Sequence, residues 1–246
     1  MRSPDLESHF DTLAPAYAGL RDASAHPTIT DALVRLADLS GRPVLDVGCG
    51  PGRLLADLSA RHAVRPIGVD RSAAMIAAAR AALGAGAELR VGPAEQLPFG
   101  DDEIERAVST MAVHLMDRPR AFAELRRVLP DGGRLAVASA DPAYFEQGWM
   151  APFFASYAAV DRARFPTADR LHDELRAAGF VEIATESIAV PHTISREQAL
   201  DRLRGRAFST FEFLSDDEWR QGVARAEDSL PDTVSYSHHM LLVAAR

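Results

Sequence analysis

Two patterns of apolar positions alternate along the chain from about residue 29 to residue 140. Short apolar runs, typical of buried strands, stand between longer stretches whose apolar residues are three or four positions apart, as in helices that bury one face. This alternation predicts an α/β fold, with a Rossmann-like, doubly wound and mostly parallel sheet covered by helices on both faces. We expect the first five strands at residues 43–47, 66–69, 89–91, 104–113 and 134–139, with helices at 29–37, from 53, at 72–83 and from 119.

The pattern changes after Ala140, where an aromatic-rich stretch interrupts the alternation of strands and helices. A helix at 168–178 and a strand at 181–189 resume it, and a last helix and a strand at 240–245 complete a seven-stranded sheet. We therefore predict one domain whose sheet is roofed by two insertions. Its parts are a core at 1–140, lid insertions at 141–167 and 191–214, and closing strands and helices at 168–190 and 215–246.

Composition narrows the classes of partner and chemistry. The formal charge of -8 argues against nucleic acid, which requires a basic face. No apolar run approaches the roughly 20 residues of a membrane span, and the first residues lack a signal-peptide pattern, so we predict a cytoplasmic protein. All 27 basic residues are arginine, which excludes a Schiff-base or phosphate-loop lysine. A single cysteine, Cys49, provides neither an intrachain disulfide nor a zinc cluster, and we predict no metal site.

The motif that carries most information is VLDVGCGPGR at 44–53, a strand running into a glycine-rich turn and a helix. Glycines let a backbone turn sharply and approach a ligand, and a helix N-terminus offers unpaired N–H groups. Asp70 ends the next strand, where a carboxylate accepts hydrogen bonds from ribose hydroxyls in such folds. Its alternative role is to cap the helix that begins at Ser72.

An acid at this distance also occurs in nicotinamide-dependent oxidoreductases. Their glycine pattern is G-x-G-x-x-G, whereas the glycines here stand at 48, 50 and 52, and Arg53 occupies the place of a small residue. The chain also lacks the Tyr-x-x-x-Lys pair of some of those enzymes, because it has no lysine. The oxidoreductase remains the less favoured alternative.

Five segments in order resemble class I S-adenosylmethionine-dependent methyltransferases of the bacterial small-molecule type, which include the trans-aconitate and quinone-biosynthesis methyltransferases. After VLDVGCGPGRL and GVDRSAAMI come VGPAEQLPF, AVSTMAVHLMD and FAELRRVLPDGGRLAVAS. The likeness covers about residues 10–139. It implies transfer of a methyl group from S-adenosylmethionine to a small-molecule acceptor that the sequence does not identify.

The resemblance also implies which residues contact the cofactor. Gly48, Cys49 and Gly50 would approach its methionine part, positioned by Asp46. The ribose would bind Asp70, and Arg71, Ala94 and Glu95 would lie around the adenine. The amino acid part and sulfonium would face Thr110 and Met111, and Tyr17 and Arg21 would reach the cofactor from a leading helix.

One departure from the family pattern affects the adenine contact. Many relatives carry an acid where this chain has Pro93, and a proline has neither a polar side chain nor an N–H group to replace it. The resemblance therefore leaves the adenine to backbone groups of Ala94 and to Glu95.

His114, after the fourth strand, is the predicted general base for a hydroxyl acceptor, with a purely structural histidine as the alternative. His172 and His192 are weaker candidates. His238 and His239 are adjacent on a predicted strand, so they point to opposite faces and do not easily chelate one ion. The aromatic residues of the two insertions, Trp149 and Phe211 among them, are predicted to line a pocket for an apolar acceptor with one polar group, or else to form only the core of a lid.

Three functions follow, in order of preference. The first is methyl transfer to a small molecule, the second is binding of S-adenosylmethionine without transfer, and the third is the oxidoreductase. Methyl transfer itself requires alignment and exclusion of water rather than a metal or a covalent nucleophile. Neither nucleic acid nor a membrane is an expected partner, and the oligomeric state is left open.

Overall fold

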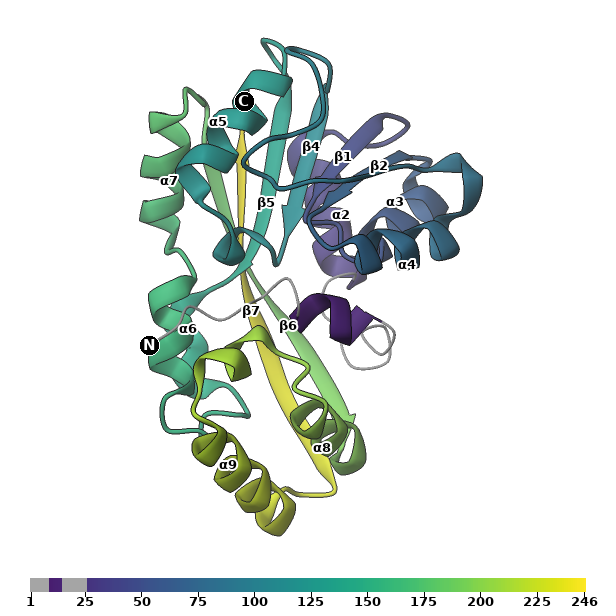
Figure 1. The fold of residues 1–246 in the computed structure, drawn as a ribbon. Coiled ribbons are helices and arrows are strands. Elements are labelled where there is room, and N and C mark those ends of the chain that lie inside the picture. The colour runs from purple at the N-terminus through teal and green to yellow at the C-terminus, as the bar shows by residue number, and fades with distance from the viewer. Residues whose placement is uncertain (1–8, 15–25) are drawn as a thin grey trace.

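A computed structural model of the chain describes residues 9–14 and 26–246. Seven strands form one sheet in the order β3-β2-β1-β4-β5-β7-β6, and helices cover both of its faces (Figure 1). Strands β1 to β5 pair in parallel, and β7 runs antiparallel to both of its neighbours. This arrangement confirms the predicted Rossmann-like, mostly parallel sheet.

The strands begin and end close to the positions expected for the core. Their bounds are β1 Pro43–Val47, β2 Arg65–Asp70, β3 Glu88–Val91, β4 Arg106–Thr110, β5 Arg134–Ala140, β6 Ala184–Ser195 and β7 Thr233–Ala245. Because the parallel strands all end at one edge, the loops after β1, β2, β3 and β4 meet there.

Residues 9–14 are helical, and α2 to α9 follow. Their bounds are α2 Pro27–Ala37, α3 Arg53–His62, α4 Ala73–Leu83, α5 Arg118–Val128, α6 Tyr157–Arg164, α7 Ala168–Ala177, α8 Arg196–Arg204 and α9 Asp216–Ser229. Short 3-10 turns stand at Gly84–Gly86, Val113–Leu115, Pro142–Gln147 and Ser209–Phe213. Within the described ranges, no helix has the length and apolar character needed to cross a membrane.

The two faces of the sheet carry different helices. Leu45, Val47 and Val137 face α5 and α7 and pack with Phe122 and Leu171. The opposite face packs against α2 and α3 through a second set of buried residues, which includes Val44, Val108, Leu33 and Leu58. Alternation of side chains along each strand thus supplies both cores, since consecutive residues point to opposite faces.

Helix α4 begins and ends where its sequence predicts. The Ser72 hydroxyl accepts a hydrogen bond from the Met75 amide at 3.1 Å, and Gly84 follows the last helical residue with a φ of 70°. The hydroxyl satisfies one of the free amides of the first turn, and glycine adopts the positive φ at little cost.

Three strands differ from the expected bounds. Strand β4 ends at Thr110 rather than Val113, since Met111 adopts a φ of 54° that no strand continues. Strand β6 starts later than predicted and passes through Pro191 to Ser195, within the predicted second insertion. It lies at the edge of the sheet, where a residue without an N–H group is tolerated. Strand β7 starts at Thr233, seven residues before its predicted start.

The long pairing of β6 with β7 carries the lid. Only Met240–Ala245 of β7 pairs with β5, whereas β6 and β7 pair along twelve positions and extend below the core as a ribbon that α8 and α9 cover (Figure 1). A separate hydrophobic core holds this region together, with Phe153, Phe154, Leu203 and Phe211 among its buried members. The predicted insertions therefore contain helices α6 and α8 and form one packed unit.

One buried ion pair joins two helices on the α5 face. Arg118 donates to both carboxylate oxygens of Glu174 in α7, at 2.6 and 3.1 Å, and its side chain is 9% exposed. Arg170 donates to the same carboxylate at 2.9 Å, but its side chain is 61% exposed. The two arginines form a matched pair that differs in burial.

We expect Arg118→Ala to lower the free energy of unfolding by about 3 kcal/mol, because it leaves a buried carboxylate without its main partner. Arg170→Ala should lower it by less than about 1 kcal/mol. Urea unfolding of both variants at pH 7 measures the difference. Equal losses would show that burial does not control the strength of this pair.

Candidate functional site

The glycine-rich turn after β1 forms the floor of a pocket at the carboxyl edge of the sheet. Gly48 and Cys49 donate their amides to the Val69 carbonyl at 2.8 and 3.1 Å, which ties the turn to β2. A Cβ on Gly48 would stand 2.5 Å from the Cβ of Ala112, and its φ is 77°. At Gly50, with a φ of 52°, a Cβ would meet nothing within 4 Å, so this face of the turn is open.

Asp70 connects three elements at this edge. One carboxylate oxygen accepts from the Gly50 amide at 2.8 Å, and the other accepts from the Ser72 amide at 2.9 Å. Burial raises the pKa of Asp70, although the hydrogen bonds from these two amides act in the opposite direction. Asp70 does not cap α4 itself, because Ser72 is the capping residue and Asp70 binds the amide of Ser72. Each oxygen of Asp70 keeps a lone pair for a further donor.

Two polar groups in the pocket wall are buried and unsatisfied. Asp46 is 2% exposed and Thr110 is 8% exposed, and neither Asp46 Oδ1 nor the Thr110 hydroxyl has a hydrogen-bond partner among the described residues. Burial, with a smaller contribution from the charge of Asp70, raises the pKa of Asp46 to about 8. Unsatisfied buried polar atoms are costly, and their presence at one pocket points to a polar, cationic ligand.

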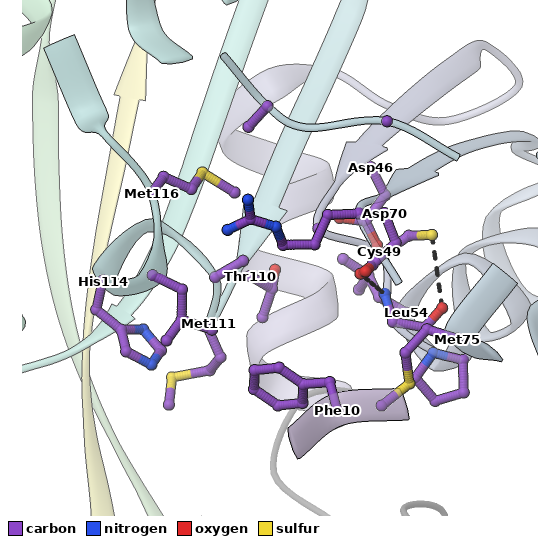
Figure 2. A pocket seen from close by; sticks show the side chains of 18 of the residues that line it. Phe10, Asp46, Cys49, Leu54, Asp70, Met75, Thr110, Met111, His114 and Met116 are labelled. Atoms are coloured by element: carbon purple, nitrogen blue, oxygen red, sulfur yellow. Dashed lines mark hydrogen bonds between the residues drawn. The ribbon is translucent and has the colours of Figure 1, made fainter. Parts of the chain in front are cut away.

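Residues from all four loops line this pocket, whose empty volume is about 1090 Å³ with the solvent at its mouth included. Every described residue that the resemblance assigns to the cofactor belongs to the lining, and so does His114. These residues are Asp46, Gly48, Cys49, Gly50, Asp70, Arg71, Ala94, Glu95, Thr110, Met111 and His114. In Figure 2, Asp70 and Met75 lie at one end of the pocket, and His114 and Met116 lie at the other.

Glu95 makes a contact that bears on the predicted adenine end of the pocket. Its carboxylate accepts from the Asp117 amide at 2.8 Å, which links the loop after β3 to the start of α5. Pro93 has no polar side chain to offer there, as the sequence indicates. The loop after β3 contributes Gly92, Ala94 and Glu95 to the pocket lining.

The N-terminal helix at residues 9–14 borders the pocket at the bottom of the view in Figure 2. Phe10 points into it (Figure 2), and Asp11 accepts from the Ser72 hydroxyl at 2.5 Å. On the other side of this helix, His9 pairs with Glu212 of the lid at 3.2 Å. Sequence reasoning assigned this helix to the site but missed Phe10. The residues it named, Tyr17 and Arg21, lie outside the described residues.

His114 stands where the first pocket meets a second cavity. Its ring stacks on Phe165 of the lid, with centroids 3.8 Å apart and planes inclined by 14°. Both His114 and Met111 line both spaces. By contrast, His172 lies in neither lining and bonds to Thr185 at 2.6 Å, so the structure separates it from the candidate site.

The structure also separates the two lid aromatics that the sequence treats alike. Trp149 lines the second cavity. Phe211 is fully buried in the lid core, and its ring centroid lies 5.1 Å from that of Phe154 and 5.9 Å from that of Phe208. Its prediction as a pocket residue is therefore wrong, and the alternative of a lid core is correct for this residue. His238 and His239 contact different residues. The ring centroid of His238 lies 4.6 Å from that of His192, and the ring of His239 stacks on Tyr144 with centroids 3.7 Å apart.

Comparison with known proteins shows that the chain is similar in sequence to methyltransferases. Residues 44–133 match the family model described as a methyltransferase domain. An O-methyltransferase from Penicillium expansum is 33% identical over 161 residues, which cover 63% of this chain and 58% of that protein. The chain spans about half the length of the curated relatives it matches.

Solved structures agree on the fold. A protein assigned as a methyltransferase of an antibiotic biosynthesis pathway in Anabaena variabilis superposes with a TM-score of 0.68 at 18% identity, over 89% of this chain and 97% of that one. A phosphoethanolamine N-methyltransferase of Haemonchus contortus, in complex with phosphomonomethylethanolamine and S-adenosylhomocysteine, gives 0.63 at 18% identity, over 98% of this chain and 58% of that one. Each shares the fold at this level of identity.

The raised pKa of Asp46 makes the stability of the ligand-free protein depend on pH. The folded carboxyl keeps its proton up to about pH 8, whereas an unfolded one loses it near its ordinary pKa of 3.8. The folded state thus holds the extra proton between these values, and stability falls as the pH rises through this window.

We expect the wild type to lose up to about 1.4 kcal/mol of unfolding free energy per pH unit between pH 5 and 8, relative to Asp46→Asn, which has no proton to lose. Urea unfolding of both proteins across this range, without ligand, measures the difference. Parallel curves would mean that Asp46 is ionised throughout.

Proposed function

We propose that this chain, which belongs to the class I methyltransferase family, transfers the methyl group of S-adenosylmethionine to the hydroxyl of a small molecule. One observation carries the proposal. The predicted cofactor residues of the described chain line a single pocket, and that pocket holds two buried polar groups that lack a partner among the described residues. The assignment to the trans-aconitate or quinone-biosynthesis group stays a prediction.

The residues present fit the cofactor. Asp46 and Thr110 would hold its methionine end, where an ammonium group would restore the ionised form of the buried Asp46 carboxyl. The open face of Gly50 allows close approach of the backbone, and the free lone pairs of Asp70 suit ribose hydroxyls. Arg71, Ala94 and Glu95 would flank the adenine. The described residues contain no cluster of three or more side chains suited to a metal.

When bound, the cofactor supplies a methyl group activated by a sulfonium. The chain contributes orientation and exclusion of water, because Phe10 covers the pocket and Met111 and His114 stand at its junction with the second cavity. His114 would take the proton of the acceptor hydroxyl through a ring nitrogen, and its stacking on Phe165 holds the ring in place. The second cavity would hold the acceptor, and the reaction is proposed for the cytoplasm.

Asp70→Asn tests the ribose contact separately from the role of Asp70 in the loop. We expect the affinity for S-adenosylhomocysteine to fall about 10- to 100-fold, as an unpaired buried group costs about 1–3 kcal/mol. The 2′,3′-dideoxy analogue, which lacks both ribose hydroxyls, should lose much less affinity, because only the backbone hydrogen bond that the asparagine NH2 cannot accept affects its binding. Calorimetric titration measures all four affinities.

An equal loss for both ligands would contradict the ribose contact and leave Asp70 only its backbone hydrogen bonds. No binding of S-adenosylhomocysteine to the wild type would end the proposed function itself. Cofactor binding without methylation of any hydroxyl compound would instead favour a binding protein that does not transfer the group.

His114→Gln tests the proposed base. We expect kcat to fall about 100-fold or more and the acidic limb of its pH profile to disappear, while the Kd for S-adenosylhomocysteine stays unchanged. His172→Gln is the matched control, since His172 lies outside both linings, and it should leave both values unchanged. If the His114→Gln enzyme stays active with an unaltered pH profile, His114 is not the base and has only a structural role.

A further inference from the structure

The second cavity lies between the end of β5, both insertions and β7, and its empty volume is about 800 Å³ with the solvent at its mouth included. Aromatic rings from different elements form its walls. Phe145, Trp149 and Tyr157 come from the first insertion, Phe208 from the second and Tyr236 from β7. Trp149 and Tyr236 have ring centroids 6.2 Å apart. Flat apolar walls of this kind favour a ligand with a ring system.

The charges in this lining disfavour an anionic acceptor. The described lining residues include the carboxylates of Asp141 and Asp161, and their basic side chains are the imidazoles of His114, His238 and His239 rather than arginines. The nearby Arg202 donates to the Tyr236 hydroxyl at 3.0 Å. A carboxylate in this space would meet two others and would lose its hydration without an arginine to replace it.

The lining also offers few contacts to an ammonium group, since the buried carboxylate of Asp161 already has hydrogen-bond partners. Asp161 is 4% exposed and accepts from the Thr210 hydroxyl at 2.8 and 2.9 Å. Arg164 donates to it at 3.1 Å and balances its charge. Asp141 uses one oxygen to accept from the Ala143 amide at 3.0 Å. A neutral acceptor therefore fits this lining better than a charged one.

Two hydroxyls in the wall provide a polar contact of defined direction. Ser209 accepts from Arg164 at 2.7 Å, so its own proton is available for an acceptor atom of a ligand. Thr210 uses its proton on Asp161, so its oxygen accepts from a ligand donor. A ligand hydroxyl is both donor and acceptor and satisfies the two together.

We infer that the second cavity takes an uncharged aromatic alcohol, with one hydroxyl at His114 and a second polar group at Ser209 and Thr210. This inference rests on the proposed function and adds the substrate class. The acceptor oxygen forms a bond to the methyl carbon as the bond from that carbon to sulfur breaks. The electron pair of the broken bond stays on sulfur, and the hydroxyl proton passes to His114.

Matched probes test the substrate class. The full chain is first titrated to saturation with S-adenosylhomocysteine, and this step tests the proposed function alone. The saturated protein is then titrated calorimetrically with 2-naphthol, 2-naphthoic acid and 2-naphthylmethylamine. We expect the naphthol to bind at least about tenfold more tightly than either charged probe. Equal or tighter binding of the acid or the amine overturns the inference, as does the absence of binding by all three.

Variants test the position of the rings and of the second hydroxyl. 2,7-Dihydroxynaphthalene should bind the wild type about 3- to 10-fold more tightly than 2-naphthol, and Thr210→Val and Ser209→Ala should each reduce that advantage. Thr193→Val, at an exposed position of β6, is the control and should preserve it. Trp149→Leu should weaken both probes, whereas Trp219→Phe should not, since Trp219 packs against the lid core outside the cavity lining.

The same variants also give the opposing outcomes. An advantage that survives both hydroxyl substitutions would place the second polar group elsewhere and overturn that part of the inference. Mass spectrometry after incubation with S-adenosylmethionine should detect the monomethyl ether of dihydroxynaphthalene. Methylation of the naphthoic acid in its place would overturn both the substrate class and the hydroxyl acceptor, while supporting methyl transfer from S-adenosylmethionine to a small molecule.

Discussion

The pair of hydrogen bonds that Asp70 accepts from Gly50 and Ser72 is the constraint on which the first pocket depends. It joins the turn after β1 to the end of β2 and the start of α4, so three elements meet with fixed spacing. Ser72 in turn holds Asp11 of the N-terminal helix. A single carboxylate therefore organises the floor of the pocket and, through its neighbour, part of the roof.

The lid depends on a different constraint, the long pairing between β6 and β7. Because β7 pairs with β5 at one end and with β6 throughout, the sheet of the core continues directly into the ribbon beneath the lid. The contact between His9 and Glu212 adds a second connection, from the roof of the first pocket to the lid. The two spaces are thus built on one continuous sheet, with Met111 and His114 between them.

Local signals explain why much of this arrangement is readable from the sequence. The glycines at 48, 50 and 52 adopt positive φ, and Ser72 and Gly84 mark the ends of α4, because each choice is decided by chemistry within a few residues. The course of β6 through Pro191 is decided by its edge position, which depends on distant pairing. Trp149 and Phe211 look alike in sequence, and only the packing of the lid places one in a cavity and the other in a core.

Met111 marks the point where the two spaces meet, and its backbone is strained. A φ of 54° is costly for an unbranched residue other than glycine, asparagine or aspartate, and such strain persists where the surroundings enforce it. Here the Met111 amide donates to the Ala138 carbonyl at 2.8 Å, and its side chain packs against both the lid core and the α2 face of the sheet. The turn at Met111 ends β4 early and directs the chain toward His114. The same strained residue thus lies between the proposed cofactor pocket and the proposed acceptor cavity and sets the place of the proposed base.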